Sequence, residues 1–424
     1  MNLVDNEIKL ERAIAVGFFR KGFPRDIARE HLDELRFLAE TAGAVVIEEF
    51  TQELEKPVVA TLIGSGKIEE IKFFVKENNI TLVIFDEDLS PVQARNLEKE
   101  FEVKVIDRSG LILDIFAKRA KTIEAKTQVE LAQLQYLMPR LTRMWTHLSK
   151  QFGGIGTKGP GETQIETDRR MIKFKIQQLK NKLLEIDKQR EIQRKNRDQL
   201  PRFALVGYTN SGKSTLMKLL TESDVYIENK LFATLDTTVR QFELPSGMKA
   251  LLSDTVGFIR KLPANLVASF RSTLAEAKYS DILIHVVDVS NPFFRDHINT
   301  VEETLKSLNI IDKPIILVFN KIDLIEEKFI INELKNEFKD YVPISAKFSI
   351  NITTLLQKMQ DIYHQNSNFY KFLLPYDKMN LIQLIYQNCE LIEKYDKDIG
   401  IELSVRINQE NKDFILNKLN TYLL

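Results

Sequence analysis

The sequence predicts an α/β fold divided into four domains, and three observations support this prediction. A glycine-rich loop, Gly207 to Thr215, lies between the apolar run 203–206 and an apolar segment of helical character that begins at Leu216. Apolar runs of strand length alternate with helical patterns on both sides of this loop. Between residues 110 and 200, apolar residues instead recur every three or four positions, which predicts long helices.

The central loop has the spacing GxxxxGK[ST] of a phosphate-binding loop, with the strand and helix that such a loop requires. Gly207 and Gly212 allow backbone conformations in which N–H groups and the helix N-terminus bind phosphate oxygens. Lys213 reaches the terminal phosphates, and the Ser214 hydroxyl is a predicted ligand of Mg2+. The predicted phosphate-binding residues are Gly207, Tyr208, Thr209, Asn210, Ser211, Gly212, Lys213, Ser214 and Thr215.

A second motif, Asn320-Lys321-Ile322-Asp323, follows the apolar run 313–319 and predicts guanine recognition. It stands where a buried strand ends, the edge at which open α/β sheets bind ligands. The Asp323 carboxylate can accept hydrogen bonds from N1–H and the exocyclic amine of guanine, an edge that adenine lacks. Asn320 would bond the base and brace the loop, and the stem of Lys321 would cover one face of the ring. Farther along, the backbone N–H groups of Ser345, Ala346 and Lys347 could read the guanine O6.

The segment Asp254-Thr255-Val256-Gly257 ends a predicted strand with the pattern DxxG. Asp254 would hold Mg2+ through water, and the N–H of Gly257 would contact the γ-phosphate and respond to its loss. Each short motif is weak alone. Their order, at separations of tens of residues within one α/β pattern, predicts a P-loop GTPase domain over residues 201–366 that binds GTP or GDP with Mg2+.

Composition limits the class of protein. The chain has 424 residues, 44% of them hydrophobic, which is enough for ordinary cores. Its single cysteine, Cys389, cannot form an internal disulfide, and the sequence has neither an apolar run of about 18 residues nor a signal-peptide pattern. We therefore expect a cytoplasmic protein without a membrane span, and we expect a monomer.

Residues 110–200 form a predicted basic helical hairpin. From Gly110 to Asp198 the chain carries 19 Lys and Arg against 10 Asp and Glu, although the formal net charge of the whole chain is zero. One long helix is predicted from an apolar stripe at steps of seven, four, three, four and three, and an earlier helix, beginning near Gly110, from a similar stripe. Two such helices bury their stripes most simply as an antiparallel pair. The stripes are Ile165, Ile172, Ile176, Leu179, Leu183 and Ile186, and Leu131, Leu134, Leu137 and Leu141.

Between these helices lies a glycine-rich tip around residues 153–161, for which two interpretations stay open. Basic and aromatic side chains near the glycines could follow a phosphate backbone and stack on unpaired bases, as RNA-binding proteins do. The alternative is a flexible turn with a solvated charged face. The charge bias of the region favours RNA. The candidate side chains are Arg140, Arg143, Trp145, Lys150 and Lys158.

The flanking regions predict two further domains. Residues 1–109 read as a small α/β domain with strands at 44–47, 58–63, 81–85 and 103–106 and helices at 26–41, 67–77 and 90–101. Its Gly64-Ser65-Gly66-Lys67 resembles a phosphate loop, but Thr61 stands where the motif needs glycine, so we predict a strand-to-helix turn. A second nucleotide contact there is the alternative. Residues 367–424 read as an α+β domain with strands at 372–375, 391–395 and 401–407 and helices at 381–386 and after Asn411.

Over nearly its full length the chain resembles the HflX-type ribosome-binding GTPases. The matching strings are His31-Leu32-Asp33-Glu34-Leu35, the phosphate loop, Phe232-Ala233-Thr234-Leu235-Asp236, Asp254 to Arg260, and GGIGTKGPGETQIETDRR from Gly153 to Arg170, which is the most specific. The resemblance implies that Thr234 is the switch threonine and a Mg2+ ligand, and that Phe232, Ala233, Leu235 and Asp236 surround the nucleotide. It assigns catalytic roles to Lys213, Thr234 and Gly257, and Mg2+ binding to Ser214, Thr234 and Asp254.

The resemblance also implies binding to the 50S ribosomal subunit and its rRNA, and GTP-dependent splitting of stalled or idle 70S ribosomes. Two other functions stay open, a GTPase that assists assembly of the large subunit and a GTP-bound, non-catalytic RNA-binding regulator. Some members of the family also have an ATP-linked activity of the N-terminal domain, which Thr61 places in doubt here.

Phe258 bears on the rate of hydrolysis. Many small GTPases have a glutamine after DxxG that orients the attacking water, whereas the Phe258 side chain has no hydrogen-bonding group. We hypothesise that the isolated protein hydrolyses GTP slowly and that ribosome contact completes the site. In the alternative interpretation Phe258 only packs under the switch and another side chain orients the water.

Overall fold

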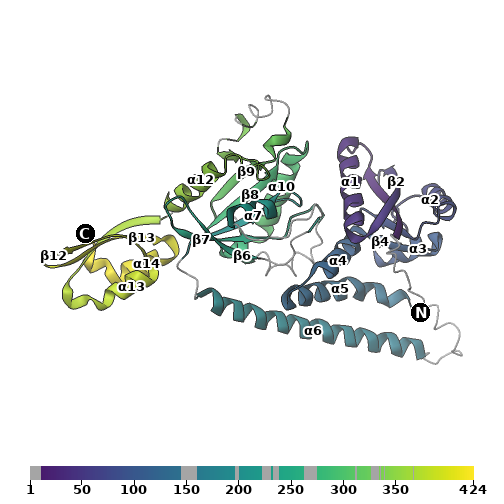
Figure 1. The fold of residues 1–424 in the computed structure, drawn as a ribbon. Helices are drawn as coiled ribbons and strands as arrows, with labels where there is room; N and C mark the ends of the chain where they lie inside the picture. Colours follow the sequence, from purple (N-terminus) through teal and green to yellow (C-terminus); the bar gives the residue numbers. More distant parts are fainter. Residues whose placement is uncertain are drawn as a thin grey trace, which may run out of the picture. The chain divides into compact units, whose positions relative to one another are not determined.

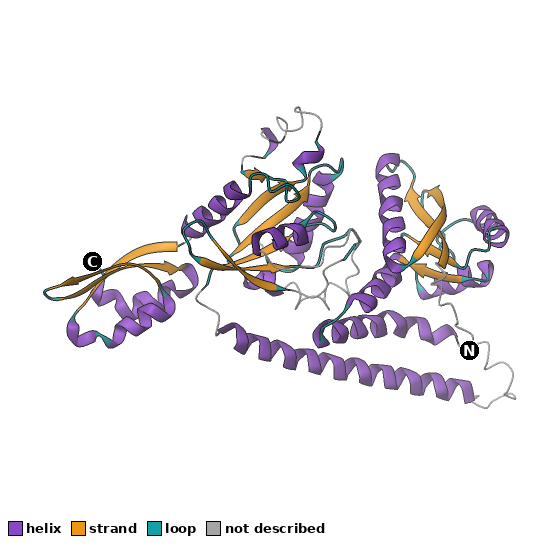
Figure 2. Ribbon diagram, in the orientation of Figure 1, coloured by secondary structure: helices purple, strands orange, loops and turns teal. Residues whose placement is uncertain are grey.

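The computed structural model divides into two compact units, whose helices and strands are drawn in Figure 1 and Figure 2. The first unit contains Met1–Ile186, Glu228–Asp236 and Lys261–Arg271, and the second contains Asp187–Ile227, Thr237–Arg260 and Ser272–Leu424. The structure describes residues 11–144, 160–195, 200–221, 231–232, 238–261, 275–310, 313–325, 334, 336–338, 340–365 and 367–424.

A four-stranded parallel sheet in the order β2-β1-β3-β4 forms the centre of the first unit (Figure 1). Its strands are β1 (Glu11–Arg20), β2 (Ala44–Leu54), β3 (Leu82–Phe85) and β4 (Lys104–Asp107), and its helices are α1 (Arg25–Ala42), α2 (Ser65–Glu77), α3 (Pro91–Phe101) and α4 (Arg108–Arg119). Because side chains alternate along a strand, Ile14 and Val16 of β1 share one face and join the core formed with α2 and α3. Helices α1 and α4 contact each other, and α1 packs on β1 and β2.

Two expectations for this sheet are wrong. The inner strand β1 is absent from the predicted strands. It is buried from Ala13 to Phe19, and a short apolar run without alternation cannot be told from a buried helical segment. The predicted strand at 58–63 is instead a turn, closed by a hydrogen bond of 2.8 Å from Leu62 N–H to the Val58 carbonyl, with Leu62 at a φ of 67°. Gly64 caps α2, so a turn rather than a strand precedes this helix.

The hairpin begins with two helices where one was expected from Gly110 onward. Helix α4 ends at Arg119, and α5 (Ile123–Met144) starts anew because the Thr122 hydroxyl accepts a hydrogen bond from Ala125 N–H at 3.1 Å. Helix α5 packs on α6 (Pro160–Lys195) through Leu131, Ile176 and Leu179, with Leu134, Met138, Ile172 and Leu183 at the edges. Leu137 of the predicted stripe is exposed. The predicted tip lies mostly outside the described residues, Trp145, Lys150 and Lys158 included.

A six-stranded sheet in the order β10-β9-β8-β5-β7-β6 forms the centre of the second unit. All its pairs are parallel except β6 with β7. The strands are β5 (Arg202–Val206), β6 (Val239–Glu243), β7 (Lys249–Asp254), β8 (Ile282–Asp288), β9 (Ile315–Asn320) and β10 (Tyr341–Pro343). The helices are α7 (Lys213–Thr221), α9 (Ala275–Tyr279), α10 (Phe294–Ser307), α12 (Ile352–Gln365) and the 3-10 turn η2 (Ile322–Leu324).

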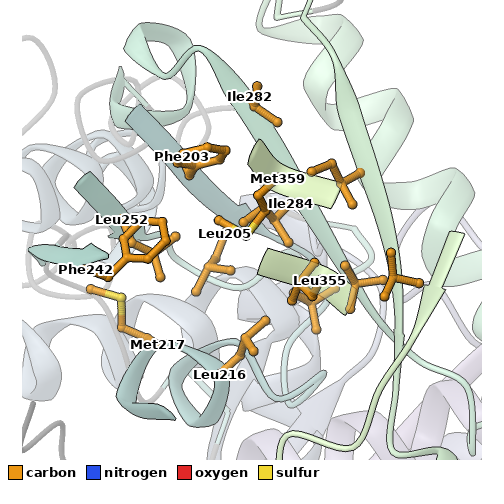
Figure 3. Packing of buried hydrophobic residues seen from close by; sticks show 14 of the residues in the cluster. Phe203, Leu205, Leu216, Met217, Phe242, Leu252, Ile282, Ile284, Leu355 and Met359 are labelled. Atoms are coloured by element: carbon orange, nitrogen blue, oxygen red, sulfur yellow. The ribbon is translucent and has the colours of Figure 1, made fainter. Parts of the chain in front are cut away.

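Helices cover both faces of this sheet. Leu216 and Met217 of α7 and Leu355 and Met359 of α12 pack on one face, as Figure 3 shows. Phe294 and Ile298 of α10 pack on the other face against β8 and β9. The carboxyl ends of the inner parallel strands β5, β8 and β9 therefore meet at one edge, where the predicted nucleotide motifs follow.

The last part of the chain forms a separate antiparallel sheet, in the order β11-β13-β12, with its own core. Its elements are β11 (Ser367–Leu374), η3 (Tyr376–Lys378), α13 (Asn380–Asn388), β12 (Glu390–Lys397), β13 (Gly400–Asn408), α14 (Gln409–Leu419) and η4 (Asn420–Tyr422). Together with the two parallel sheets, this confirms the predicted α/β fold class. No helix among the described residues is both long and apolar enough to cross a membrane.

Candidate nucleotide-binding site

The phosphate loop connects β5 to α7 and needs glycine at two positions. Gly207 has a φ of 155° and Gly212 a φ of 96°. A Cβ atom on Gly207 would lie 2.2 Å from the Val286 carbonyl oxygen, and one on Gly212 would lie 2.1 Å from Asn320 Nδ2. The two glycines therefore have two roles: they allow the positive φ angles of the turn, and they leave room for the Val286 carbonyl and the Asn320 side chain to approach the loop.

Lys213, at the start of α7, is buried, and its ammonium group donates to two carbonyl groups of the loop. The distances from Nζ are 3.0 Å to Gly207 O and 2.7 Å to Tyr208 O. Burial lowers the pKa of Lys213 to about 8, and the nearby charge of Asp254 opposes the shift. Beneath it, burial lowers the pKa of His285 to about 3, with a further contribution from the Lys213 charge, so His285 is neutral at pH 7. Lys213 then supplies the positive charge at this point of the loop.

The residues predicted to hold Mg2+ come together. Ser214 Oγ donates to Asp254 Oδ2 at 3.0 Å, although the two residues lie on different elements, α7 and β7. A hydroxyl and a carboxylate are oxygen ligands of the kind that Mg2+ prefers, so the donor set fits this ion. Next to Asp254, Thr255 donates to the Leu205 carbonyl at 2.6 Å and fixes the end of β7 against β5. Thr234, the third predicted ligand, lies outside the described residues.

The segment after Asp254 is bound to the phosphate loop through its backbone. Phe258 N–H donates to Gly207 O at 3.0 Å, and Thr209 N–H donates to Phe258 O at 2.8 Å. A Cβ atom on Gly257 would lie 3.1 Å from Lys213 Nζ, which places Gly257 beside the predicted phosphate ligand. Phe258 is 2% exposed, so its ring is buried. No charged or polar side chain is present at this position to orient water.

Tyr208 is a loop residue whose side-chain role the sequence does not predict. Its Oη accepts a hydrogen bond from Arg260 N–H at 3.0 Å, and its ring stacks on His297 of α10 with a centroid distance of 3.8 Å and an interplanar angle of 6°. The motif marks Tyr208 only as a spacer, and His297 is more than 80 residues away, so no local signal could find this pair. Tyr208 thus ties the segment after Gly257 to the loop a second time.

The guanine side of the site is organised by Asn320, at the end of β9. Asn320 Nδ2 donates to Ser211 O at 2.9 Å, and Asn320 Oδ1 accepts from Ala346 N–H at 3.0 Å. Asn320 therefore connects the phosphate loop to the SAK segment, and its bond to the base stays a prediction. Asp323, in η2, accepts from Ser345 Oγ at 2.6 Å, so the NKxD and SAK segments meet.

Lys321 is held beside this loop by a partner that the motif does not contain. Its backbone is left-handed, with a φ of 67°, and its Nζ donates to Asp288 Oδ2 at 2.6 Å. Asp288 ends β8, next to β9 in the sheet, and this position is the one sequence signal that could have identified it. The contact fixes the stem of Lys321, the part predicted to cover the base. In the SAK segment, the Lys347 ammonium lies over the Phe348 ring, 5.1 Å from its centroid.

Part of the predicted switch segment cannot be placed. Ala233, Leu235 and Asp236 lie outside the described residues, as does Thr234. Phe232 is described, is 2% exposed, and packs its ring edge on Phe116 of α4 with a centroid distance of 4.5 Å. Its side chain is therefore buried in the first unit, which leaves its backbone for the predicted nucleotide contact.

Two hydroxyl groups of the loop bear on whether a ligand is expected. Thr209 Oγ1 and Ser211 Oγ are buried and have no hydrogen-bond partner within the described part of the chain. A buried hydroxyl without a partner costs about 1–3 kcal/mol, which a bound polar ligand can offset. Together with the glycines and Lys213, these groups fit a site for phosphate.

Family models match three consecutive parts of the chain. They are described as the N-terminal region of a GTP-binding GTPase over residues 29–117, the middle region of a GTP-binding GTPase over residues 119–197, and a 50S ribosome-binding GTPase over residues 202–321. The first match includes β2, β3 and β4 but not β1, the second covers the helical region, and the third includes all strands of the six-stranded sheet except β10. The third match ends at Lys321, inside the NKxD motif.

Several curated relatives share most of the chain. GTPase HflX of Flavobacterium psychrophilum is 54% identical over 316 residues, 74% of this chain and 76% of that protein. GTPase HflX of Caldanaerobacter subterraneus is 46% identical and covers 96% of this chain and 93% of its own length. GTPase HflX of Escherichia coli is 41% identical over 94% and 93%, respectively. Among solved structures, the SsGBP and GDP complex has a TM-score of 0.49 and 29% identity, and covers 84% of this chain and 99% of that one.

Substitution of Gly212 tests whether nucleotide binding depends on the close approach of Asn320 to the loop, rather than only on the positive φ of a glycine. Gly212→Ala places a Cβ 2.1 Å from Asn320 Nδ2 and should displace this side chain, whose lost buried hydrogen bonds would weaken GDP binding by about 10- to 100-fold. Gly247→Ala is the matched control, since Gly247 also has a positive φ, 81°, but meets nothing closer than 3.6 Å. Titration calorimetry of both variants checks this, and equal GDP affinities would contradict the proposed close approach.

The lowered pKa of Lys213 predicts a pH dependence of nucleotide binding. A pKa of about 8, below the ordinary 10.5, means that the free site loses its positive charge as the pH rises through about 8. Phosphate favours the charged form, so binding above that pH should take up close to one proton, and affinity should fall by up to about tenfold per pH unit. Calorimetry in buffers of different ionisation enthalpy measures the uptake. Lys213→Arg keeps its charge and should remove this proton uptake, and wild-type binding without uptake at pH 8.5 would contradict the assignment.

Proposed function

Because the chain belongs to the HflX family of GTPases, we propose that it binds the 50S ribosomal subunit and uses GTP binding and hydrolysis to split stalled or idle 70S ribosomes into subunits. The observation that carries the proposal is the match of residues 202–321 to the 50S ribosome-binding GTPase family. This region contains the phosphate and magnesium motifs and the start of the guanine motif, which follow parallel strands of one sheet. The ribosome is in the cytoplasm, so we place the activity there.

In this proposal the chain binds GTP through groups that different strands supply. Backbone N–H groups of the loop after β5 and the Lys213 ammonium bind the phosphates. Asp323, held by Ser345, accepts hydrogen bonds from the guanine edge, and Lys321, held by Asp288, covers the ring. Ser214 and Asp254 would hold Mg2+, which neutralises charge on the β- and γ-phosphates when bound.

Hydrolysis is proposed to switch the protein between two states. The γ-phosphate would hold Gly257 and Thr234 in one arrangement, and its loss would release both. Such a switch acts only through a difference in affinity, so the ribosome must bind the GTP state more tightly. Cleavage then converts a tight binder into a weak one and permits release from the 50S subunit.

The identity of residue 258 supports a hydrolysis rate that depends on the ribosome. The Phe258 ring is buried and both of its backbone groups bond the phosphate loop, so this residue cannot take the water-orienting role that glutamine has in many small GTPases. We propose slow intrinsic hydrolysis that contact with the 50S subunit accelerates. The basic helices of residues 110–200 and their glycine-rich tip are the proposed rRNA-binding element, since positive charge favours the phosphate backbone.

Substitution of Asp323 tests guanine recognition. Asp323→Asn replaces an acceptor by an amide, so GDP affinity should fall by about 100-fold or more. Xanthosine diphosphate should bind the variant better than the wild type, because its C2 carbonyl can accept from the new amide. Asp361→Asn on the exposed face of α12 is the matched control and should change neither affinity. If Asp323→Asn left the preference for GDP over xanthosine diphosphate unchanged, Asp323 would not read the base.

Phosphate release and subunit sedimentation test the ribosomal role. We expect 50S subunits to raise single-turnover phosphate release by about tenfold or more, and GTP with 70S ribosomes to yield free 30S and 50S subunits. Lys213→Ala should lose both effects. Equal rates with and without 50S subunits would contradict stimulation. Stimulated hydrolysis without free subunits would favour a role in assembly, and no phosphate release under any condition would favour a non-catalytic regulator.

A further inference from the structure

Helix α5 is attached to the first unit's sheet at one buried carboxylate, that of Asp107. Asp107 ends β4, at the carboxyl edge of the parallel sheet, and is 1% exposed. Its Oδ1 accepts from Gly110 N–H at 2.8 Å and caps α4, and its Oδ2 accepts from Leu89 N–H at 3.1 Å. Two backbone groups next to the sheet therefore fix this carboxylate before α5 contributes anything.

Two side chains of α5 donate to the same carboxylate. Tyr136 Oη lies 2.7 Å from Asp107 Oδ1, and Arg140 Nη2 lies 2.6 Å from Asp107 Oδ2. Arg140 Nη2 also donates to the Leu89 carbonyl at 2.8 Å. Tyr136 and Arg140 are four positions apart, so they share one face of the helix. We call Asp107, Tyr136 and Arg140 the α5 clamp.

The Arg140 guanidinium has a geometry that a lysine cannot reproduce. Its central carbon lies 3.6 Å from the centroid of the Tyr136 ring, and its Nη1 donates to the Tyr136 carbonyl at 3.1 Å. A planar guanidinium can stack on a ring and donate in several directions at once, whereas an ammonium is a compact point charge. The Arg140 side chain is 19% exposed, and its hydrogen bonds to Asp107, Leu89 and Tyr136 all stay within the first unit.

Two features of the surroundings support the contact between Tyr136 and Asp107. A Cβ atom on Gly110 would lie 2.7 Å from Tyr136 Oη, so glycine at this helical position leaves room for the phenol. Burial raises the pKa of Tyr136, and the Asp107 charge raises it further, so the phenol stays protonated and can donate.

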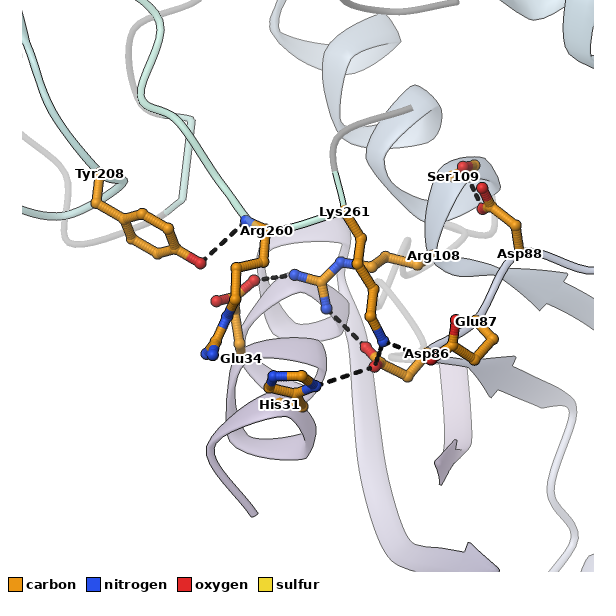
Figure 4. A network of polar contacts seen from close by, with 10 residues as sticks. All are labelled: His31, Glu34, Asp86, Glu87, Asp88, Arg108, Ser109, Tyr208, Arg260 and Lys261. Atoms are coloured by element: carbon orange, nitrogen blue, oxygen red, sulfur yellow. Dashed lines mark hydrogen bonds and ion pairs between the residues drawn. The ribbon is translucent and has the colours of Figure 1, made fainter. Parts of the chain in front are cut away.

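The sheet side of the clamp is fixed independently of α5. Leu89, in the connection after β3, is 4% exposed. One residue earlier, Asp88 accepts a hydrogen bond from the Ser109 hydroxyl of α4 (Figure 4). The connection that presents Leu89 is therefore bound to α4 as well as to Asp107. A movement of α5 relative to the sheet would have to break several of these bonds together.

The clamp lies at the end of α5 from which the glycine-rich tip continues. Helix α5 ends at Met144, about one turn after Arg140, and α6 begins at Pro160. Pro139 lies inside α5, between the two clamp side chains, and has no N–H to donate to the helix. The apolar packing between α5 and α6 is not directional. The directional bonds of the clamp therefore act where the helix itself is weakened.

We propose that the α5 clamp fixes the direction in which the glycine-rich tip leaves the first unit, and that Arg140 serves rRNA binding as a positioning residue rather than through a contact with rRNA. The inference rests on the proposed role of the tip in rRNA binding. It reverses the expectation from the sequence, which placed Arg140 among the side chains that could follow a phosphate backbone. A tip with fewer orientations loses less entropy when it binds, so the clamp raises affinity without touching the ligand.

Substitutions that keep or remove the Arg140 charge separate positioning from contact. Arg140→Lys keeps the charge but loses the planar geometry, so affinity for 50S subunits should fall by about fivefold or more. Arg140→Gln should lose a similar factor, and its affinity should keep the salt dependence of the wild type, because no phosphate contact is removed. Tyr136→Phe keeps every positive charge, should act in the same direction, and should add little to Arg140→Lys.

Arg36→Lys is the matched control for these measurements. It makes the same exchange in a surface ion pair with Glu49, 3.3 Å long, and should leave 50S affinity unchanged. The proposal would be wrong if Arg140→Lys bound like the wild type while Arg140→Gln lost affinity and reduced the slope of log affinity against log salt by about one, since Arg140 would then contact a phosphate. Wild-type affinity in Tyr136→Phe and Arg140→Lys would overturn it equally.

Distances between spin labels test the clamp without ribosomes. In a Cys389→Ser background, labels at Lys99→Cys on α3 and Lys173→Cys on α6, both exposed positions, report how the helical region is held on the sheet. The distance distribution from double electron–electron resonance should widen by about 1.5-fold or more in Tyr136→Phe and in Arg140→Lys. An unchanged width would overturn the proposal, as would a wider distribution with unaltered 50S affinity.

Failure of the proposed function has a different signature. If the unsubstituted chain did not bind 50S subunits, the ribosomal role would be wrong and this inference would fall with it. If that chain bound 50S subunits and split ribosomes while every clamp variant matched it, only this inference would be lost.

Discussion

The carboxamide of Asn320 is the contact on which the nucleotide site depends. It donates to Ser211 in the phosphate loop and accepts from Ala346 in the loop predicted to read the base, so one side chain sets the distance between the two subsites. The contact exists only because Gly212 has no Cβ. Each buried polar group of the amide that loses its hydrogen-bond partner lowers the free energy of unfolding by about 1–3 kcal/mol. The observed position of the Asn320 side chain is therefore strongly favoured over others. Two motifs more than 100 residues apart thereby become a single site.

The sequence predicts which motifs the fold brings together because each motif is local. A strand, a loop of fixed spacing and a helix are encoded within about 20 consecutive residues, and the parallel sheet brings the carboxyl ends of such strands to one edge. The same reasoning fails where local pattern is ambiguous. Strand β1 is missed because burial on both faces removes the alternation that marks a strand, and the break before α5 is missed because it depends on one capping hydroxyl, that of Thr122.

Side-chain partners distant in sequence are the part that no pattern reveals. No sequence motif contains the partner residues Asp288, His297 and Asp86. Only the fold brings them to Lys321, Tyr208 and Lys261, respectively. The ion pair between Asp86 and Lys261 shows the physical reason. Buried charges must be compensated, yet the compensating lysine comes from a segment about 175 residues away, after the chain has left the first unit and returned to it.

The segment that follows the DxxG motif bears on how GTP hydrolysis can be accelerated. Phe258 offers no group to orient water, so acceleration requires a rearrangement of the segment around it or a group from elsewhere. That segment is bound to the phosphate loop through both backbone groups of Phe258 and through Arg260 N–H, which donates to Tyr208 Oη. Acceleration by a rearrangement of this segment would therefore have to break or replace these contacts with the phosphate loop.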